Sequence, residues 1–151
     1  MSVTIEVVTA ASDELLDGLN HLLPQLSSTA PPLTRFNLEA LVDSSALTVF
    51  VARQGEQLVG TLTLVIFPIP TGLRAWIEDV VVDESARGLG VGAALTNAAT
   101  DEAQRRGVRS VDLTSRPSRE AANALYQKLG FSIRDTNVYR FLVEPPKGDL
   151  K

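Results

Sequence analysis

The sequence has no cysteine and a single histidine among its 151 residues. The missing thiols exclude disulfide bonds, thiolate zinc sites and a cysteine nucleophile. His21 lies in an apolar helical pattern, which favours a packed or surface histidine over a catalytic one. A Gly-x-Ser-x-Gly turn, which would carry a serine nucleophile, is also missing. Covalent catalysis therefore has no obvious carrier, which leaves direct group transfer between bound substrates, and we expect no metal.

Long apolar runs and an excess of basic residues are lacking as well. No run approaches the ~20 apolar residues of a membrane-spanning helix, so we expect no membrane association. The net charge of −4 argues against a nucleic-acid partner, which requires a basic face. The start of the chain shows no basic stretch typical of a secretory signal, and together with the missing cysteines this makes the cytoplasm the expected location.

The size and composition of the chain predict one globular domain. The hydrophobic fraction of 44% and the charged fraction of 21% are typical of soluble globular proteins. A chain of 151 residues is long enough to bury a substantial core. We expect a single domain over residues 1–144 and a flexible polar tail over residues 145–151.

The stretch from Trp76 to Gly92 is the most informative part of the sequence. An apolar run rich in β-branched residues ends at Val82, a short polar turn follows, and three glycines occupy alternate positions before an Ala-rich helical segment. A strand that leads through a glycine-rich turn into a helix directs free backbone N–H groups toward an anion. Glycine also adopts positive φ angles and lets a ligand approach the backbone closely. The stretch therefore predicts a cradle for a pyrophosphate.

Two nucleotide-binding motifs are alternatives for this cradle. A Walker loop needs Lys and then Ser or Thr after the last glycine, but alanines follow Gly92. The dinucleotide fingerprint G-x-G-x-x-A is satisfied by Gly88, Gly90 and Ala93. However, that fingerprint should follow its strand at once, whereas here a polar turn separates Val82 from the first glycine. A dinucleotide-binding oxidoreductase therefore stays a minor alternative.

A third motif fits better, and it is supported in two places. Arg87-Gly88-Leu89-Gly90-Val91-Gly92 matches the signature (Gln/Arg)-x-x-Gly-x-(Gly/Ala). Downstream, Asn123-Ala124-Leu125-Tyr126-Gln127-Lys128-Leu129-Gly130-Phe131 has the form of a helix-to-strand motif. On these two motifs, which occur in the right order, the chain resembles the GNAT superfamily of acyl-CoA-dependent N-acetyltransferases. The resemblance identifies the superfamily and no individual member.

The predicted order of elements is β-α-α-β-β-β-α-β-α-β-β. Strands are expected over residues 3–8, 47–52, 58–67, 73–82, 108–115, 131–134 and 138–143, and helices over residues 13–23, 35–42, 89–106 and 119–129. Ser12, Thr34 and Ser118 are the expected N-caps of the first, second and fourth helices. The resemblance implies a mixed α/β acyl-CoA N-acyltransferase fold. In this fold about four helices flank a central, mostly antiparallel twisted sheet of about seven strands with a splayed parallel pair. It also implies that the acyl-CoA arm lies in the split between that pair.

The resemblance assigns the chemistry to two residues. Glu78 is the candidate base, and because side chains alternate along a strand, it should share a face with Val80 and Val82. Asp79 should point the opposite way unless a bulge intervenes. Tyr126 resembles the residue that donates a hydrogen bond to the departing thiolate. Alternatively, Glu78 only orients the substrate amine or pairs with an arginine, and Tyr126 is an aromatic of the core.

The expected co-substrate is acetyl-CoA. Val80 should present its backbone N–H to the thioester carbonyl, and Asn123 resembles the residue that bonds the pantetheine amides. The full set of residues expected to bind the coenzyme is Val80, Val81, Val82, Arg87, Gly88, Leu89, Gly90, Val91, Gly92, Ala93 and Asn123.

The acceptor is expected to be a primary amine of a small molecule, an amino acid or a peptide. Its candidate contacts are Arg35 and Phe36 in the second helix, Asp79, and Tyr139 in the final hairpin. The run Ile77–Val82 is similar to that of glucosamine-phosphate acetyltransferases, although the N-terminal half offers no supporting sugar-phosphate motif. A second function of a different class is a non-catalytic acyl-CoA-binding or regulatory module on the same fold. The last strand or the sheet edge is a candidate homodimer contact.

Overall fold

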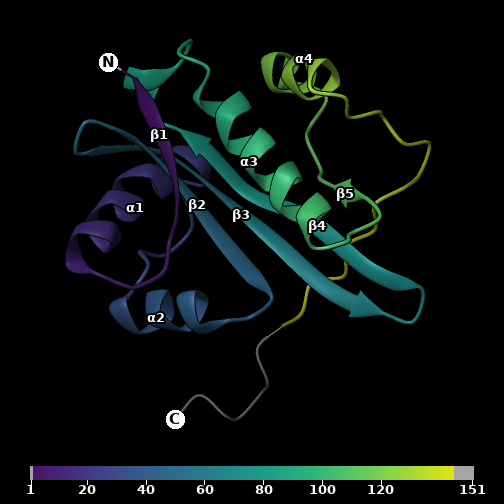
Figure 1. Ribbon diagram of the computed structural model, residues 1–151, viewed down its shortest axis with the longest axis horizontal. Coiled ribbons are helices and arrows are strands. Elements are labelled where there is room, and N and C mark those ends of the chain that lie inside the picture. The colour runs from purple at the N-terminus through teal and green to yellow at the C-terminus, as the bar shows by residue number, and fades with distance from the viewer. Residues whose placement is uncertain (1, 145–151) are drawn as a thin grey trace.

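The computed structural model describes residues 2–144, in which helices lie on both faces of one sheet (Figure 1). The elements follow in the order β1 (Val3–Val7), α1 (Asp13–Leu26), α2 (Arg35–Asp43), β2 (Leu47–Gln54), β3 (Gln57–Ile69), β4 (Gly72–Val82), the 3₁₀ turn η1 (Glu84–Ala86), α3 (Val91–Arg105), β5 (Val111–Asp112) and α4 (Glu120–Lys128). The strands are bonded in the order β1-β2-β3-β4-β5. The first four pair antiparallel and β5 joins β4 in parallel, so the expected mixed α/β fold with a parallel pair is confirmed.

The first two helices begin where the sequence predicts, at side-chain caps. Ser12 Oγ accepts a hydrogen bond from the Leu15 N–H at 3.1 Å, and Thr34 Oγ1 accepts one from the Asn37 N–H at 3.1 Å. Each cap satisfies one of the backbone donors that the start of a helix leaves open. Helix α1 runs on past Pro24, contrary to its predicted end. A proline this close to the end of a helix removes only one backbone hydrogen bond, which the apolar face of α1 outweighs.

The sheet separates two hydrophobic clusters. The cluster on one face lies under α3, which contributes Val91, Leu95, Ala99 and Ala103. The cluster on the other face lies under α1 and α2, which contribute Leu15, Leu19, Leu22 and Leu38. Strand β2 serves both clusters in alternation, because Phe50 and Ala52 belong to the first and Val51 to the second. The three main helices are therefore held on opposite faces by the two periodicities of the sequence.

Strand β4 carries a bulge in its middle. Its register with β3 shifts between Thr61 and Thr63, so that Asp79 and Val80 together stand opposite a single residue of β3. Asp79 adopts a φ of 52°, a left-handed conformation that is uncommon for residues other than glycine. The bulge takes two residues of β4 out of the antiparallel ladder.

The parallel pair separates almost as soon as it forms. Only Ala75 pairs with Val111 and Trp76 with Asp112, so β5 is much shorter than the predicted strand over residues 108–115. Beyond Trp76, β4 has no partner on this side among the described residues. The pairing between the two strands therefore ends well before the end of β4, and the edge of β4 beyond Trp76 is unpaired on this side within residues 2–144.

The two predicted C-terminal strands, residues 131–134 and 138–143, are wrong. Within the described part of the chain the sheet has five strands, and residues 131–144 form none. The segment leaves large apolar side chains exposed: Ile133, Val138, Tyr139, Phe141, Leu142 and Val143. A run with high β-propensity becomes a strand only where a neighbour satisfies its backbone and covers a face. The short β5 supplies no such neighbour.

Helix α4 begins later than predicted. Its first residue is Glu120, and Arg119 precedes it as a cap without a side-chain hydrogen bond, in place of the predicted Ser118. The predicted flexible tail, residues 145–151, lies outside the described residues. Between residues 2 and 144, no helix combines the length and apolar character needed to cross a membrane.

Candidate active site

The glycine-rich turn lies between η1 and the start of α3. Gly88 and Gly90 adopt φ angles of 83° and 79°, in the left-handed region that favours glycine. At both positions a Cβ would have no heavy atom of the described chain within 4 Å. Arg87 and Leu89 flank Gly88 and are exposed. The turn is therefore open on its outer side, and only the lack of side chains keeps that space free for a ligand.

The start of α3 offers backbone donors at this turn. The first backbone hydrogen bond into the helix runs from the Ala94 N–H to the Gly90 carbonyl at 3.0 Å. The N–H groups of Val91, Gly92 and Ala93 precede that bond, and Gly90 has no side chain to cap them. The helix dipole adds positive potential at the same end. This donor set fits an anion such as the expected diphosphate.

The bulge at Asp79 separates Glu78 from the residues that follow it. Val80 and Val82 pack against the cluster under α3, and Val81 is buried in the cluster under α1. Glu78 lies on the face opposite Val80 and lines a cavity there. The expectation that Glu78, Val80 and Val82 share a face is wrong, because the extra residue of the bulge inverts the alternation of side chains.

The same bulge frees backbone groups in the middle of β4. Asp79 and Val80 have no counterpart in the register with β3, and the pairing with β5 has already ended at Trp76. Backbone N–H and C=O groups away from water require a partner. A ligand bound along the unpaired edge of β4 can supply that partner, as the expected contact between the Val80 N–H and a carbonyl oxygen requires.

Two cavities meet at Trp76 of β4. The larger, of about 1180 Å³, is lined by Tyr126 and Asn123 among others. The smaller, of about 420 Å³, is lined by Glu78. Three residues line both cavities: Trp76, Thr114 and Val138. The fold thus brings Glu78 and Tyr126 to adjoining cavities that share a wall.

Tyr126 and Asn123 lie on α4. The Tyr126 ring meets that of Phe131 edge-on, with ring centroids 5.8 Å apart. Burial raises the pKa of the Tyr126 hydroxyl, and the positive charge of Arg119 opposes that shift. The hydroxyl therefore stays protonated at neutral pH and is available as a hydrogen-bond donor. Asn123 Nδ2 donates to the Arg116 carbonyl at 2.9 Å, which leaves its carbonyl oxygen as an acceptor.

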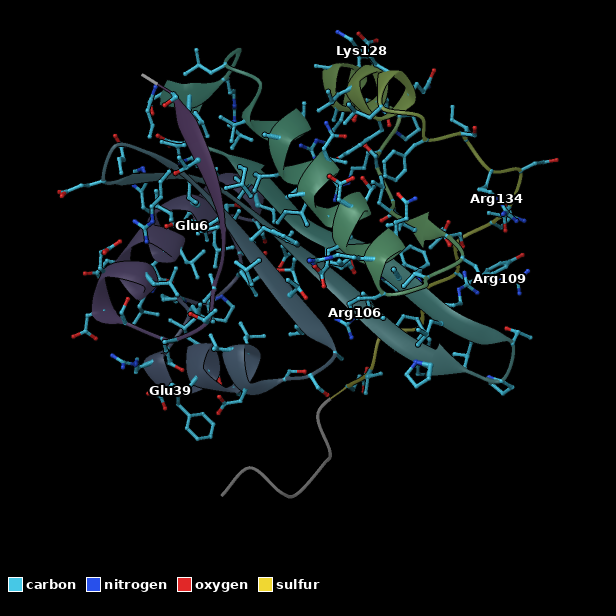
Figure 2. The ribbon with its side chains drawn as sticks, in the orientation of Figure 1. Glu6, Glu39, Arg106, Arg109, Lys128 and Arg134 are labelled. Carbon is cyan, nitrogen blue, oxygen red and sulfur yellow. The ribbon has the colours of Figure 1, made fainter. Side chains whose placement is uncertain are left out.

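Further polar groups of the larger cavity were not singled out by any sequence pattern. The Ser115 hydroxyl is buried and has no hydrogen-bond partner among the described residues. Leaving such a group unpaired costs ~1–3 kcal/mol, so a bound ligand that pairs with it is favoured. Arg109 and Arg134 also line this cavity and lie on the same side of the molecule (Figure 2). The larger cavity therefore suits a polar ligand with negative charge.

Three residues predicted to contact the acceptor lie away from both cavities. Arg35 is held on the surface by Asp13 at 2.8 Å and Glu39 at 3.0 Å. Phe36 on α2 is 79% exposed, and Tyr139 in the C-terminal segment is 87% exposed. Neither Arg35 nor either aromatic residue lines one of the two cavities.

The smaller cavity is instead lined by residues that sequence reasoning missed. Besides Glu78, its lining residues are Val65, Phe67, Trp76, Thr114, Val138 and Arg140. A signal was present in the alternation of the C-terminal run, because Val138 and Arg140 are two residues apart and line the same cavity. Tyr139, the predicted contact, lies between them in the sequence and lines neither cavity.

Asp83, directly after β4, connects the 3₁₀ turn η1 to helix α1 through its side-chain contacts. Its buried carboxylate accepts hydrogen bonds from Gln25 Nε2 at 2.7 Å and from the Ser85 hydroxyl, and it lies 3.3 Å from His21 Nε2. The hydrogen bonds from Ser85 and Gln25 lower the pKa of Asp83. Gln25 Oε1 also accepts from the Glu84 N–H at 3.2 Å. The N-terminal helix therefore helps to position the glycine-rich turn.

Comparisons with known proteins agree on one family. A family model described as "Acetyltransferase (GNAT) family" matches residues 14–131. The chain is 36% identical over 124 residues to glucosamine 6-phosphate N-acetyltransferase of Trypanosoma brucei brucei, a match that covers 77% of this chain and 79% of the relative. It is 36% identical over 93 residues to L-2,4-diaminobutyric acid acetyltransferase of Marinococcus halophilus, covering 62% and 53% respectively. A crystal structure of a Trypanosoma brucei acetyltransferase has a TM-score of 0.76 at 29% identity and covers 93% of this chain and 100% of its own.

Proposed function

Because the chain belongs to the acetyltransferase (GNAT) family, we propose that it moves an acetyl group from acetyl-CoA directly to a primary amine of a small molecule, an amino acid or a peptide. The observation that carries the proposal is the edge of β4 beyond Trp76, which β5 leaves unpaired. It is followed by the glycine cradle and flanked by the adjoining cavities of Tyr126 and Glu78. Direct transfer accords with a chain that has no cysteine nucleophile.

The residues that would hold the coenzyme lie near this unpaired edge of β4. The N–H groups of residues 91–93 suit its diphosphate, and the exposed Arg87 adds positive charge nearby. The free backbone at Val80 suits the arm, as do the Asn123 carbonyl oxygen and the unpaired Ser115 hydroxyl. Acetyl-CoA supplies the activated acetyl group as a thioester.

Glu78 is the base that accepts the proton of the substrate amine. An alkyl ammonium has a pKa of ~10.4, so at pH 7 only about one molecule in 2,500 is the free amine that can attack. The Glu78 carboxylate takes the proton from the amine nitrogen, directly or through one water, as that nitrogen bonds to the acyl carbon. The Val80 N–H donates to the carbonyl oxygen as it becomes negative.

Tyr126 acts on the leaving side of the reaction. As the bond from the acyl carbon to sulfur breaks, the Tyr126 hydroxyl donates a hydrogen bond to the sulfur, which carries the departing electron pair. A thiol has a pKa of ~8.5, below the ~10 of an ordinary tyrosine. Burial raises the pKa of Tyr126 further, so the hydroxyl keeps its proton and stabilises a thiolate that is finally protonated from solvent.

The alternative function is a non-catalytic acyl-CoA-binding or regulatory module on the same fold. Such a module needs the cradle but has no use for a carboxylate and a phenol in adjoining cavities. The position of Glu78 and Tyr126 in cavities that share a wall therefore favours the enzyme.

A thiol-release assay with acetyl-CoA and a panel of primary amines tests the proposal. The panel holds amino acids, amino sugars with and without phosphate, diamines and peptide N-termini. We expect turnover with at least one class, lost in Glu78→Gln and kept in the exposed control Glu56→Gln. Calorimetry of CoA binding runs beside it. Binding without turnover on the whole panel would favour the module.

We also propose that two copies of the chain associate through the C-terminal segment. Tyr139, Phe141 and Val143 occupy alternate positions and are 87%, 89% and 85% exposed. Leu142, between Phe141 and Val143, is also exposed, at 77%, so this part of the segment presents a continuous group of large apolar side chains to solvent. A row of large apolar side chains on a run with high β-propensity suits pairing with a second copy. Light scattering should give a dimer mass that Tyr139→Ser with Phe141→Ser abolishes, and a monomeric wild type at micromolar concentration would refute this.

A further inference from the structure

The smaller cavity beside β4 carries one charge of each sign in apolar surroundings. Glu78 comes from β4 and Arg140 from the C-terminal segment, and most of the remaining lining is apolar: Val65, Phe67, Trp76 and Val138. Glu78, Arg140 and Val138 are all exposed, so the cavity is open to solvent and a small ligand can reach both charges directly. The two side chains therefore offer a ligand one charge of each sign in the same cavity.

No acidic or basic side chain in the described part of the chain forms an ion pair with either of these charges. None of the ion pairs among residues 2–144 includes Glu78 or Arg140. Arg53 and Arg74, by contrast, are paired with carboxylates. An arginine and a glutamate that share a cavity, each without a protein partner there, call for a ligand that brings a cation to one and an anion to the other.

We infer that the acceptor is a small amine that also carries an anionic group, a carboxylate or a phosphate, which Arg140 binds while Glu78 receives the amine. The inference rests on the proposed acetyl transfer to an amine and specifies its substrate class. The cavity volume of about 420 Å³ lies at the small end of the range of ligand pockets. That volume suits a small molecule with an apolar or sugar-sized body between its two charges.

The charge pair discriminates against other amines. Glu78 alone would favour a diamine, but a second ammonium would be repelled by Arg140 in the same cavity. A neutral amine would leave the guanidinium without a partner. A carboxylate or a phosphate accepts two parallel N–H bonds from a guanidinium, which gives both orientation and affinity. Arg140 is therefore a specificity-determining residue.

Matched substrate pairs test the inference. One arm compares an amino acid with its carboxamide, and the other compares glucosamine 6-phosphate with glucosamine. For each substrate kcat/KM is measured in the wild type and in Arg140→Gln, so that differences in amine pKa between substrates cancel in the ratio. We expect Arg140→Gln to lower kcat/KM by about 10- to 100-fold for the anionic member of one pair, mainly through KM, and to leave the neutral member nearly unchanged. The pair that responds identifies carboxylate or phosphate.

Two further variants sharpen the comparison. Arg140→Lys keeps the charge but loses the planar fork, so its kcat/KM for the anionic substrate should fall between wild type and Arg140→Gln. Arg106→Gln removes a charge at the exposed end of α3, where the residue lines neither cavity, and should change neither ratio (Figure 2). Equal CoA affinities by calorimetry establish that each variant is folded.

Three outcomes would overturn the inference while the proposed function stands. These are a loss in Arg140→Gln by the same factor for anionic and neutral substrates, no loss for either, and a diamine as the best acceptor. Absence of thiol release by the wild type with every amine, with CoA still bound, would instead refute the proposed transfer itself.

Discussion

Replacing Gly90 by alanine separates the ligand-binding role of the cradle from its backbone geometry. Gly90 has a φ of 79°, and a Cβ there would have no heavy atom of the described residues within 4 Å. Gly107, just beyond the other end of α3, has a φ of 77° and equally open surroundings. The two glycines are matched in strain and in space, and they differ in whether an anion is expected beside them.

The magnitudes follow from this match. An L-residue at a left-handed position costs about 1–2 kcal/mol, so both variants should lower the free energy of unfolding by a similar amount. For a domain of this size the melting temperature should fall by about 2–8 °C in each. Only the methyl group of Gly90→Ala stands where the diphosphate approaches the N–H groups of α3. Loss of one such charge-assisted hydrogen bond should weaken CoA binding by about 10- to 100-fold.

Calorimetric titration with CoA, at a temperature where both variants are folded, gives the two dissociation constants. As a second readout, CoA should raise the melting temperature of Gly107→Ala as much as that of the wild type, and that of Gly90→Ala much less, because stabilisation by a ligand depends on its concentration relative to Kd. Equal CoA affinities in Gly90→Ala and Gly107→Ala would refute the assignment of the glycine-rich turn as the diphosphate site.

Three further predictions concern single side chains. Glu78→Gln should lower kcat by about 10²- to 10⁴-fold and alter the pH dependence of turnover, and an unchanged profile would rule out the role as a base. Tyr126→Phe keeps the ring packed and should lower kcat by about 10- to 100-fold with little change in KM, so full turnover would exclude the hydrogen bond to sulfur. Hydrogen bonds from Ser85 and Gln25 lower the pKa of Asp83, so its stabilisation is present above the ordinary value of 3.8 and is lost as the pH falls through the lower folded value. Urea midpoints of the wild type should therefore fall more steeply on acidification than those of Asp83→Asn, and parallel curves would contradict this.

The elements with strong local signals were predicted nearly in full. Helices α1 and α2 begin at the predicted hydroxyl caps, and β2, β3 and β4 lie where apolar runs alternate with turn residues. These signals are local, because a cap or an alternating run acts within a few residues. The segments 131–134 and 138–143 are also rich in apolar residues, but the strands predicted there are not formed. A strand needs a partner, and pairing depends on distant parts of the chain.

In the candidate site, too, local features were predicted from the sequence, whereas features that depend on distant residues were not. The glycine-rich stretch predicted a turn in which positive φ angles are tolerated, and the backbone has such angles at Gly88 and Gly90. The roles of Glu78 and Tyr126 stay predictions, although the fold brings the two to adjoining cavities. The face of Glu78 could not be predicted, because the run of Glu78 to Val82 has the pattern of an uninterrupted strand. The bulge at Asp79 arises from the register with β3.

The sequence by itself determined the family, the order of the first elements and the turn that precedes α3. Each of these depends on backbone freedom and apolar period over short distances, which the residue types specify directly. Only the tertiary structure decided which side chains share the smaller cavity. Glu78 and Arg140 are far apart in the chain, and the sheet, the bulge and the course of the C-terminal segment bring them to the same space.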